Sequence, residues 1–145
     1  MELSHYTNKG FYHVALLRKD TLKEGKTKKY NTYITPNVAF GERKHKGVYL
    51  ITKGEGILKI GETENLQHRL SCYESHSGLT NQRLREHLID QDEYGIYFLE
   101  TPSYKCGYGG VQVEAGISYK DLEKQLLIQY RDNTGRLPIL NKGLK

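Results

Sequence analysis

The sequence predicts an α+β fold in which a small, mainly antiparallel sheet is flanked by helices. Two short runs rich in β-branched residues, GVYLIT at 47–52 and GILKIG at 56–61, are joined by the turn signal KGEG, which is typical of a β-hairpin. Residues 118–133 carry apolar side chains at helical spacing, with one face formed by Leu122, Leu126, Leu127 and Tyr130. The chain of 145 residues is long enough for one domain with its own core.

The N-terminal third is expected to contribute strands and a loop. GFYHVALL at 10–17 is a strand candidate, whereas the polar, glycine-containing segment 20–29 is expected to be a loop. Residues 30–40 are rich in Tyr and Thr but are interrupted by Pro36, so only part of this segment is expected to be strand.

Two helices are expected after the hairpin. Thr63 is the expected N-cap of the first helix, which spans 64–76, and Glu64 in its first turn complements the helix dipole. Residues 80–90 have the pattern of a second helix.

The C-terminal part of the chain is expected to return to strand and then to helix. Residues 94–100 are expected to form a strand, and the glycine-rich segment 101–117 a loop with a short strand at 111–115. Ser118 and Asp121 make a weakened capping box, with Asp in place of the usual Glu or Gln, so the last helix is expected to begin there.

The positive charge is concentrated near the N-terminus. Residues 1–46 hold ten Lys or Arg against four Asp or Glu, whereas the rest holds twelve against thirteen. An excess of one sign in one segment favours contact with a polyanion over a merely solubilising loop. The candidate nucleic-acid contacts are Lys26, Lys28 and Lys29.

The cysteine content and the absence of long apolar runs indicate a cytoplasmic protein. Two cysteines, Cys72 and Cys106, do not make a disulfide framework, which suits a reducing compartment. No run is long and apolar enough for a membrane span, and residues 1–20 lack a secretory signal pattern.

A charged side chain interrupts the apolar stripe of the helix predicted at 64–76. Leu66, Arg69, Leu70 and Tyr73 occur at i, i+3, i+4 and i+7 and therefore share one face. Glu123 similarly borders the apolar face of the last helix. Because a buried charge needs a partner, either Arg69 and Glu123 form a salt bridge or both face a cleft that holds a phosphate and a metal ion.

These residues resemble the motifs of the GIY-YIG nucleases over about residues 47–141. The matching positions, in chain order, are Gly47-Val48-Tyr49, Lys59-Ile60-Gly61, Arg69, Tyr73, Glu123, Pro138 and Asn141. The resemblance divides the single domain 1–145 into a basic N-terminal extension, 1–46, and a nuclease core, 47–141. Lys59 departs from the usual Tyr of the second motif, but some restriction enzymes of the family carry Lys there.

The resemblance implies a metal-dependent DNA endonuclease and a role for each matched side chain. Glu123 would hold one Mg²⁺, for which Mn²⁺ can substitute. Tyr49 would accept the proton of the attacking water and Arg69 would bind the phosphate, with Tyr73 donating a hydrogen bond to it. Asn141 would position the strand end or the substrate.

Two further residues extend this expected site. Tyr49 and Lys59 are expected to point to the same face as cross-strand neighbours, where the ammonium favours the phenolate and so makes Tyr49 a better base near neutral pH. The alternative is that Lys59 is an ordinary surface lysine. His76 is a candidate auxiliary proton donor beside the phosphate.

The sequence also allows an alternative metal site and alternative functions. His68, Cys72 and His76 are spaced i, i+4, i+8 and, with Cys106, form an alternative zinc-ligand set. The chain is expected to be a stand-alone restriction-type or phage or mobile-element nuclease, with a repair or structure-specific nuclease or a non-catalytic nucleic-acid-binding module as alternatives. Since one active site cuts one strand, double-strand cleavage would call for a homodimer.

Overall fold

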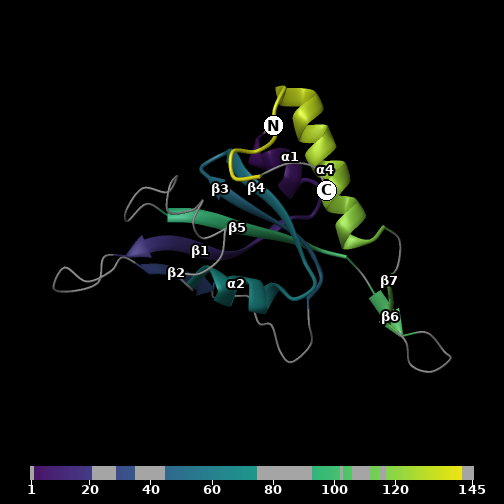
Figure 1. The fold of residues 1–145 in the computed structure, drawn as a ribbon, viewed down its shortest axis with the longest axis horizontal. Coiled ribbons are helices and arrows are strands. Elements are labelled where there is room, and N and C mark those ends of the chain that lie inside the picture. The colour runs from purple at the N-terminus through teal and green to yellow at the C-terminus, as the bar shows by residue number, and fades with distance from the viewer. Residues whose placement is uncertain are drawn as a thin grey trace.

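The computed structural model describes residues 2–20, 29–34, 45–74, 93–101, 103–105, 112–114 and 117–141, although the side chains of 19–20, 29–34, 72–74, 103–105 and 112–114 are not described. The elements follow in the order α1 (Leu3–Thr7), β1 (Tyr12–Asp20), β2 (Lys29–Ile34), β3 (Gly47–Lys53), β4 (Gly56–Thr63), α2 (Leu66–Glu74), β5 (Glu93–Glu100), β6 (Ser103–Lys105), β7 (Gln112–Glu114) and α4 (Tyr119–Thr134). Figure 1 shows their arrangement.

Five of the strands form one sheet in the order β2-β1-β5-β3-β4. Every neighbouring pair in it is antiparallel. β5 lies in the middle of the sheet although it is the last of the five along the chain, so it joins the β1–β2 pair to the β3–β4 hairpin. β6 and β7 form a separate two-stranded sheet near the start of α4 (Figure 1). The predicted class, α+β with an antiparallel sheet flanked by helices, is confirmed.

The segment expected to be a basic extension, residues 1–46, contributes to this sheet. β1 pairs with β2 on one side and with β5 on the other, with Leu17 opposite Thr32 and Tyr94 respectively. Val14, Ala15 and Leu17 are fully buried. The described part of this segment therefore shares the core of the domain.

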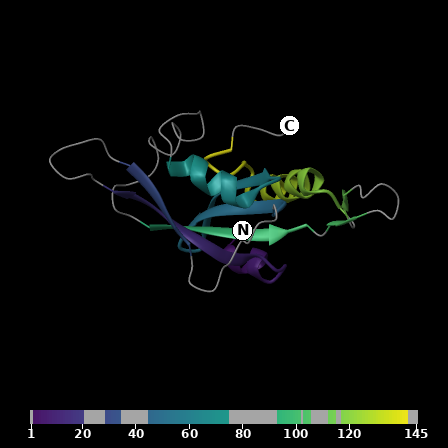
Figure 2. The ribbon, with the colours of Figure 1, turned by 90° about the horizontal axis from the view of Figure 1, so that it is seen from below.

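The core consists of two hydrophobic clusters that alternate along the strands. In β3, Tyr49 and Ile51 belong to one cluster, and Val48 and Leu50 belong to the other. The helices divide in the same way: α2 contributes Leu66 and Leu70 to the first cluster, whereas α1 and α4 contribute to the second Leu3, Tyr6, Leu126 and Leu127. Figure 2 shows α1 and α2 on opposite sides of β5. The period-2 alternation of a buried strand thus places a helix layer on each face.

The helix boundaries confirm part of the prediction and correct part of it. α4 begins after Ser118, whose Oγ accepts a hydrogen bond from the Asp121 backbone N–H at 3.2 Å, as the capping pattern predicts. The first helix begins later than predicted, at Leu66, and Asn65 rather than Thr63 caps it: Asn65 Oδ1 accepts from the His68 N–H at 3.2 Å. Thr63 instead accepts from the Asn65 N–H at 3.1 Å, holding the turn before the helix. The short helix α1 was not predicted.

Some predicted elements fall outside the described residues. The helix expected at 80–90 lies there, as do most of the loop at 20–29 and the second half of 30–40. In the loop expected at 101–117, the predicted short strand is present as β7, and it pairs with β6, which was not predicted. Among the described helices, none is long and apolar enough to cross a membrane.

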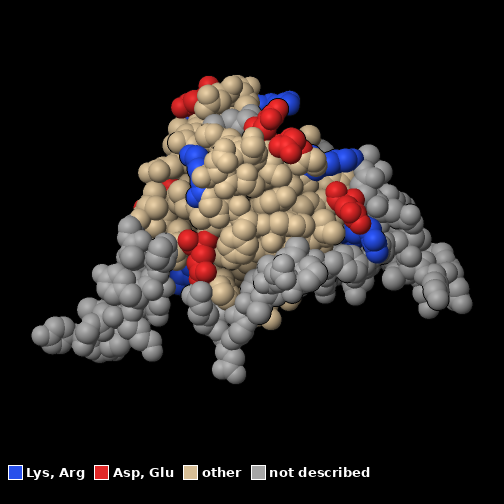
Figure 3. All heavy atoms as spheres, turned by 180° about the vertical axis from the view of Figure 1, so that it is seen from behind, with Lys and Arg blue, Asp and Glu red and all other residues tan. Residues whose placement is uncertain are grey.

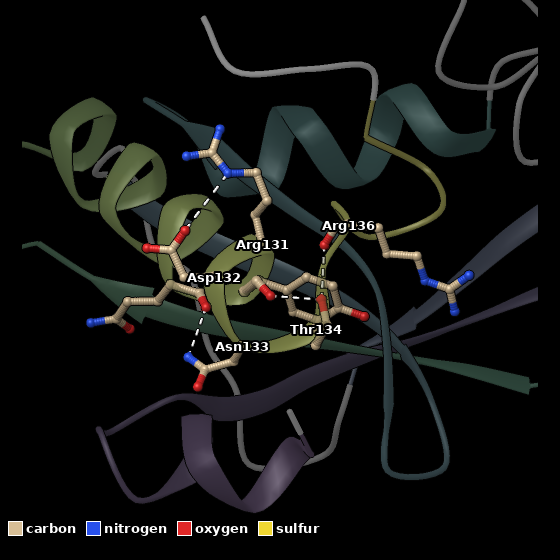
Figure 4. A network of polar contacts seen from close by, with 7 residues as sticks. Arg131, Asp132, Asn133, Thr134 and Arg136 are labelled. Carbon is tan, nitrogen blue, oxygen red and sulfur yellow. Dashed lines mark hydrogen bonds and ion pairs between the residues drawn. The ribbon is translucent and has the colours of Figure 1, made fainter.

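Side-chain hydrogen bonds to backbone carbonyls stabilise the C-terminal end of α4 (Figure 4). Asn133 Nδ2 donates to the Gln129 carbonyl at 2.8 Å, and Thr134 Oγ1 lies 2.6 Å from the Tyr130 carbonyl and 2.9 Å from that of Arg136. Gly135 then adopts a left-handed conformation, with φ 83°, and donates to the Arg131 carbonyl. This reversal directs the following residues back toward β4.

Candidate functional site

The ring of Tyr49 lies across Gly61 on the neighbouring strand. The β3–β4 register pairs these two residues directly. A Cβ on residue 61 would lie 2.5 Å from Tyr49 Oη and 2.7 Å from Cε1, and closest of all to Cζ. Tyr49 itself is only 2% exposed. The hydroxyl of Tyr49 therefore lies over Gly61 on the edge strand β4.

Lys59 lies on the same face as Tyr49, but it is not the residue opposite it. The register pairs Lys59 with Ile51, and Ile51 points to the same face as Tyr49 because the two are separated by one residue of β3. Tyr49 and Lys59, which were expected to be direct neighbours, are thus diagonal neighbours, because Gly61 is the residue opposite Tyr49. Lys59 is half-buried.

Arg69 faces a pocket between the two helix starts and the end of β4. The pocket has a volume of about 460 Å³ and is lined by Glu62, Thr63, Glu64, Asn65, His68, Arg69, Tyr119 and Lys120. Arg69 is half-buried, whereas Leu66 and Leu70 on the same stripe are 0% and 3% exposed. The arginine interrupts the apolar stripe because the sheet and helices enclose a pocket, and not a continuous apolar core, at this level.

The first turns of α2 and α4 both line this pocket. Asn65 and Ser118 cap these helices, and Tyr119 and Lys120 open α4. Helix N-termini carry partial positive charge and unpaired N–H groups, which favour anions. The charged lining is nevertheless mixed, since Glu62 and Glu64 accompany Arg69 and Lys120. A ligand with both phosphate oxygens and hydrogen-bond donors suits such a lining.

The anchoring of α2 fixes the position of Arg69. The backbone N–H of Leu66 donates to the His45 carbonyl at 3.0 Å, just before β3 begins. His45 Nδ1 also lies 3.3 Å from Glu100 Oε1 at the end of β5. The start of α2 is thereby tied to the same end of the sheet from which Tyr49 projects.

Glu123 lies one helical turn beyond the pocket. It follows Tyr119 by four residues, so both residues lie on the same side of α4, and it is half-buried. Among the described side chains, no ion pair joins Arg69 to Glu123, so the salt-bridge alternative of the sequence analysis has no support there. The described residues contain no group of three potential metal ligands. A single carboxylate can nevertheless hold Mg²⁺ when substrate oxygens and waters complete the shell.

Asn141 is bound to the edge strand next to the second motif. Its Oδ1 accepts from the Ile60 N–H at 3.0 Å and its Nδ2 donates to the Ile60 carbonyl at 2.8 Å. The Leu140 N–H donates to the Leu58 carbonyl at 2.9 Å. Of the two roles expected for Asn141, the strand contact is thus present in the geometry.

Several predicted site residues lie where their side chains are not described. Lys26, Lys28 and His76 fall outside the described residues, and only the backbone is described for Lys29 in β2 and Tyr73 in α2. Of the alternative zinc set, His76 and Cys106 also fall outside, and Cys72 has no described side chain. On the face drawn in Figure 3, the described basic and acidic residues are interspersed, so this face carries no field of one sign.

The motifs do not indicate five of the pocket-lining residues. His68 is a candidate only as a zinc ligand, and the other four are Glu62, Asn65, Tyr119 and Lys120. The sequence feature that these residues share is their position: each lies within about one turn of the start of a predicted helix. Only the fold, which brings the starts of α2 and α4 to the end of β4, shows that these positions meet.

Comparison with known proteins gives a likeness at the level of the fold. No model of a known protein family matches the chain, and no curated protein matches it significantly. One solved structure is similar: the restriction endonuclease HPY188I in complex with product DNA, with a TM-score of 0.51 and 16% identity. The match covers 96% of this chain and 84% of that chain. The chain therefore shares the fold of a restriction endonuclease over nearly its whole length.

Proposed function

We propose that this protein is a metal-dependent DNA endonuclease of the GIY-YIG type that hydrolyses phosphodiester bonds. The observation that carries the proposal is the pocket at the starts of α2 and α4, where Arg69 lies beside the end of β4. The fold shared with a restriction endonuclease, whose solved structure contains product DNA, supports the same conclusion. Of the motif residues, Arg69 lines the pocket, and Glu123 follows the pocket-lining Tyr119 by one turn of α4.

In the proposed reaction, each side chain acts on the scissile phosphate or on the attacking water. Arg69, which makes no ion pair with another described residue, binds two phosphate oxygens and offsets the charge that develops on them. Lys59 on the same face stabilises Tyr49 as the phenolate, which accepts the proton of the attacking water and becomes the neutral phenol. Tyr73 donates a hydrogen bond to the phosphate, and His76 protonates the leaving oxygen.

Glu123 is the proposed ligand of one Mg²⁺, with Mn²⁺ as its substitute. When bound, the ion would supply Lewis-acid polarisation of the phosphate. The remaining ligands would be substrate oxygens and waters, as is usual for Mg²⁺ at phosphate sites. Glu123 is proposed for this role because it follows the pocket-lining Tyr119 by four residues and so lies on the same side of α4.

Replacing the proposed metal ligand tests the function directly. Glu123→Gln keeps the side-chain shape but removes the charge, so it should abolish Mg²⁺-dependent nicking of supercoiled plasmid while duplex affinity, measured by fluorescence anisotropy, stays within about twofold. Glu55→Gln is the matched control, because it removes an exposed carboxylate at the β3–β4 turn, away from the pocket. Plasmid cleavage that persists in EDTA would exclude the metal-dependent reaction.

The biological setting of the proposed enzyme is also a proposal. We infer a stand-alone restriction-type or phage or mobile-element nuclease acting as a cytoplasmic homodimer, since two active sites are needed to cut both strands. Sequencing the ends produced from mixed DNA would separate this proposal from a repair or structure-specific nuclease. DNA binding with no cleavage in Mg²⁺ or Mn²⁺ would indicate a non-catalytic module.

A further inference from the structure

Lys120 places a second cation in the pocket that contains Arg69. Arg69 reaches the pocket from α2, whereas Lys120 lies in the first turn of α4, so the two charges come from different helices. The motifs behind the proposed function include Arg69 but not Lys120. The proposed reaction therefore leaves the Lys120 ammonium without a role.

The positive charge of Lys120 is not neutralised within the described structure. Two carboxylates also line the pocket, those of Glu62 and Glu64. Among the described residues, neither of them forms an ion pair with either cation. The Lys120 ammonium lies instead over the Tyr119 ring, 5.9 Å from its centroid. Such a contact is weak at an exposed site, so Lys120 can exchange the ring for an anion.

The pocket is larger than a single phosphate group requires. Its volume of about 460 Å³ falls in the range of pockets that hold small organic ligands. Because a nucleotide unit contains a sugar and a base as well as a phosphate, this volume suits a short stretch of a nucleic-acid strand. The pocket therefore has room for more than the scissile phosphate.

Lys120 lies one turn of α4 before the proposed metal ligand. Lys120 and Glu123 are three positions apart, so they are neighbours on the helix surface, with Cβ atoms about 5–6 Å apart. In the proposed reaction, the metal ion on Glu123 and the Arg69 guanidinium hold the same phosphate. Lys120 would lie beside that phosphate without being one of its ligands.

From this arrangement we infer that Lys120 binds a phosphate that flanks the scissile phosphate in the cleaved DNA strand. A lysine ammonium binds phosphate as a compact point charge on a flexible stem, which suits a contact that holds the strand. Lys120 contributes to substrate affinity and not to the chemical step. That the ligand is DNA rests on the proposed function, whereas an anion site at Lys120 does not.

Binding measurements test the anion site without depending on cleavage. Lys120→Met removes the charge and keeps an unbranched stem. Its affinity for a duplex, measured by fluorescence anisotropy without divalent metal, should fall about 3- to 10-fold, and the log–log salt slope by about 0.9. Lys120→Arg should retain both. Lys124→Met is the matched control and should keep the wild-type slope, because Lys124 is an exposed lysine of the same helix that does not line the pocket.

A carboxylate variant tests the sign of the ligand charge. Glu64→Gln removes a negative charge from the pocket lining, so it should strengthen duplex binding by about twofold if a phosphate occupies the pocket. Weaker binding by Glu64→Gln would contradict an anion site.

Neutral linkages in the DNA locate the phosphate that Lys120 binds. A duplex series carries one uncharged methylphosphonate at successive positions on either side of the cleaved bond. At one flanking position, the neutral linkage should weaken wild-type binding by the same factor as Lys120→Met, and it should cost Lys120→Met nothing further. Lys124→Met should show the full loss at that position.

Three results would overturn the inference. Wild-type affinity and salt slope in Lys120→Met would show that the ammonium binds no phosphate. An equal loss in Lys124→Met would assign the effect to the general charge of α4. Coupling of Lys120 to the scissile position alone would make it a ligand of the cleaved phosphate. If the wild-type protein binds DNA but does not cleave it in Mg²⁺ or Mn²⁺, the proposed function fails, and the salt slopes alone decide the anion site.

Discussion

Tyr49 and Gly61 form a pair in which the aromatic ring of one strand occupies the space above the glycine of the next. The glycines with positive φ in the described part of the chain are Gly10, Gly54 and Gly135, so Gly61 is not required for an unusual backbone conformation. It is required for space. The second motif therefore needs glycine because the tyrosine of the first motif lies on it.

Gly61→Ala should destabilise the protein and also suppress cleavage. The new Cβ would collide with the Tyr49 ring, and forcing the ring away from β4 should cost about 1–3 kcal/mol in the free energy of unfolding. Urea unfolding measures this cost. Gly56→Ala on the same strand is the control, because its Cβ would meet only the Lys53 carbonyl at 3.4 Å. Equal stability of the two variants would mean that the ring moves freely.

Tyr49→Phe isolates the hydroxyl from the packing. Phenylalanine keeps the ring over Gly61, so thermal stability should change little. Loss of a general base should lower the single-turnover cleavage rate by about 10²–10⁴-fold with DNA binding nearly intact. Robust cleavage by this variant would assign the buried phenol to packing alone.

Lys59→Met should slow cleavage at neutral pH, with partial recovery as the pH is raised. Without the ammonium the phenolate of Tyr49 forms only at higher pH, so the pH–rate profile should shift to the alkaline side. The profile decides between two roles for Lys59. A lower rate at every pH, parallel to wild type, would instead make Lys59 a contact to the phosphate.

Neutralising Lys26, Lys28 and Lys29 together should weaken DNA binding regardless of sequence. Each lost phosphate contact should reduce the log–log dependence of affinity on salt by about 0.9. Anisotropy titrations at several salt concentrations measure this slope. A slope equal to that of wild type would show that these lysines do not touch the backbone of DNA.

The stability of the protein should fall at alkaline pH because of Tyr6. Its burial, and then the nearby Tyr130, raise the pKa of Tyr6 to about 12 from 10.0. Between these values the unfolded chain releases the proton while the folded protein keeps it, so stability falls as the pH rises from 10 to 12 and is unaffected below 10. The loss should be roughly 1 kcal/mol at pH 11.

Urea unfolding at pH 9 and pH 11 would measure this contribution. Tyr6→Phe should lose less stability than wild type between the two values, whereas Tyr12→Phe, at an exposed tyrosine, should behave like wild type. An identical loss in Tyr6→Phe would assign the alkaline effect to other groups.

Local patterns predicted the elements that local chemistry determines. The turn between β3 and β4, the Ser118 cap and the apolar face of α4 each depend on residues within one or two turns, and all three were read correctly. The cap of α2 was misplaced because Thr63 and Asn65 are both good capping residues, and only the backbone path shows which one precedes the helix. α1 has five residues, too few for a periodic signal.

The parts that sequence could not predict depend on contacts between distant residues. The central position of β5, the meeting of Arg69 with Tyr119 and Lys120, and the diagonal relation of Lys59 to Tyr49 all follow from how strands and helices pack. The motif resemblance indicated which side chains to consider. It did not indicate that the Asn141 amide would bind Ile60.

The contacts of residues 138–141 with β4, at Leu58 and Ile60, also constrain how the protein is made. Asn141 and Ile60 are 81 positions apart. The ribosome therefore completes the β3–β4 hairpin long before it adds Asn141, whose side chain binds Ile60. Domains fold progressively during synthesis, and unpaired strand edges are prone to aggregate. Until residues 138–141 emerge, β4 would present an open edge that chaperones or a neighbouring nascent chain can bind. The Ile60 backbone of β4 would then gain these bonds only after residue 141 has been synthesised.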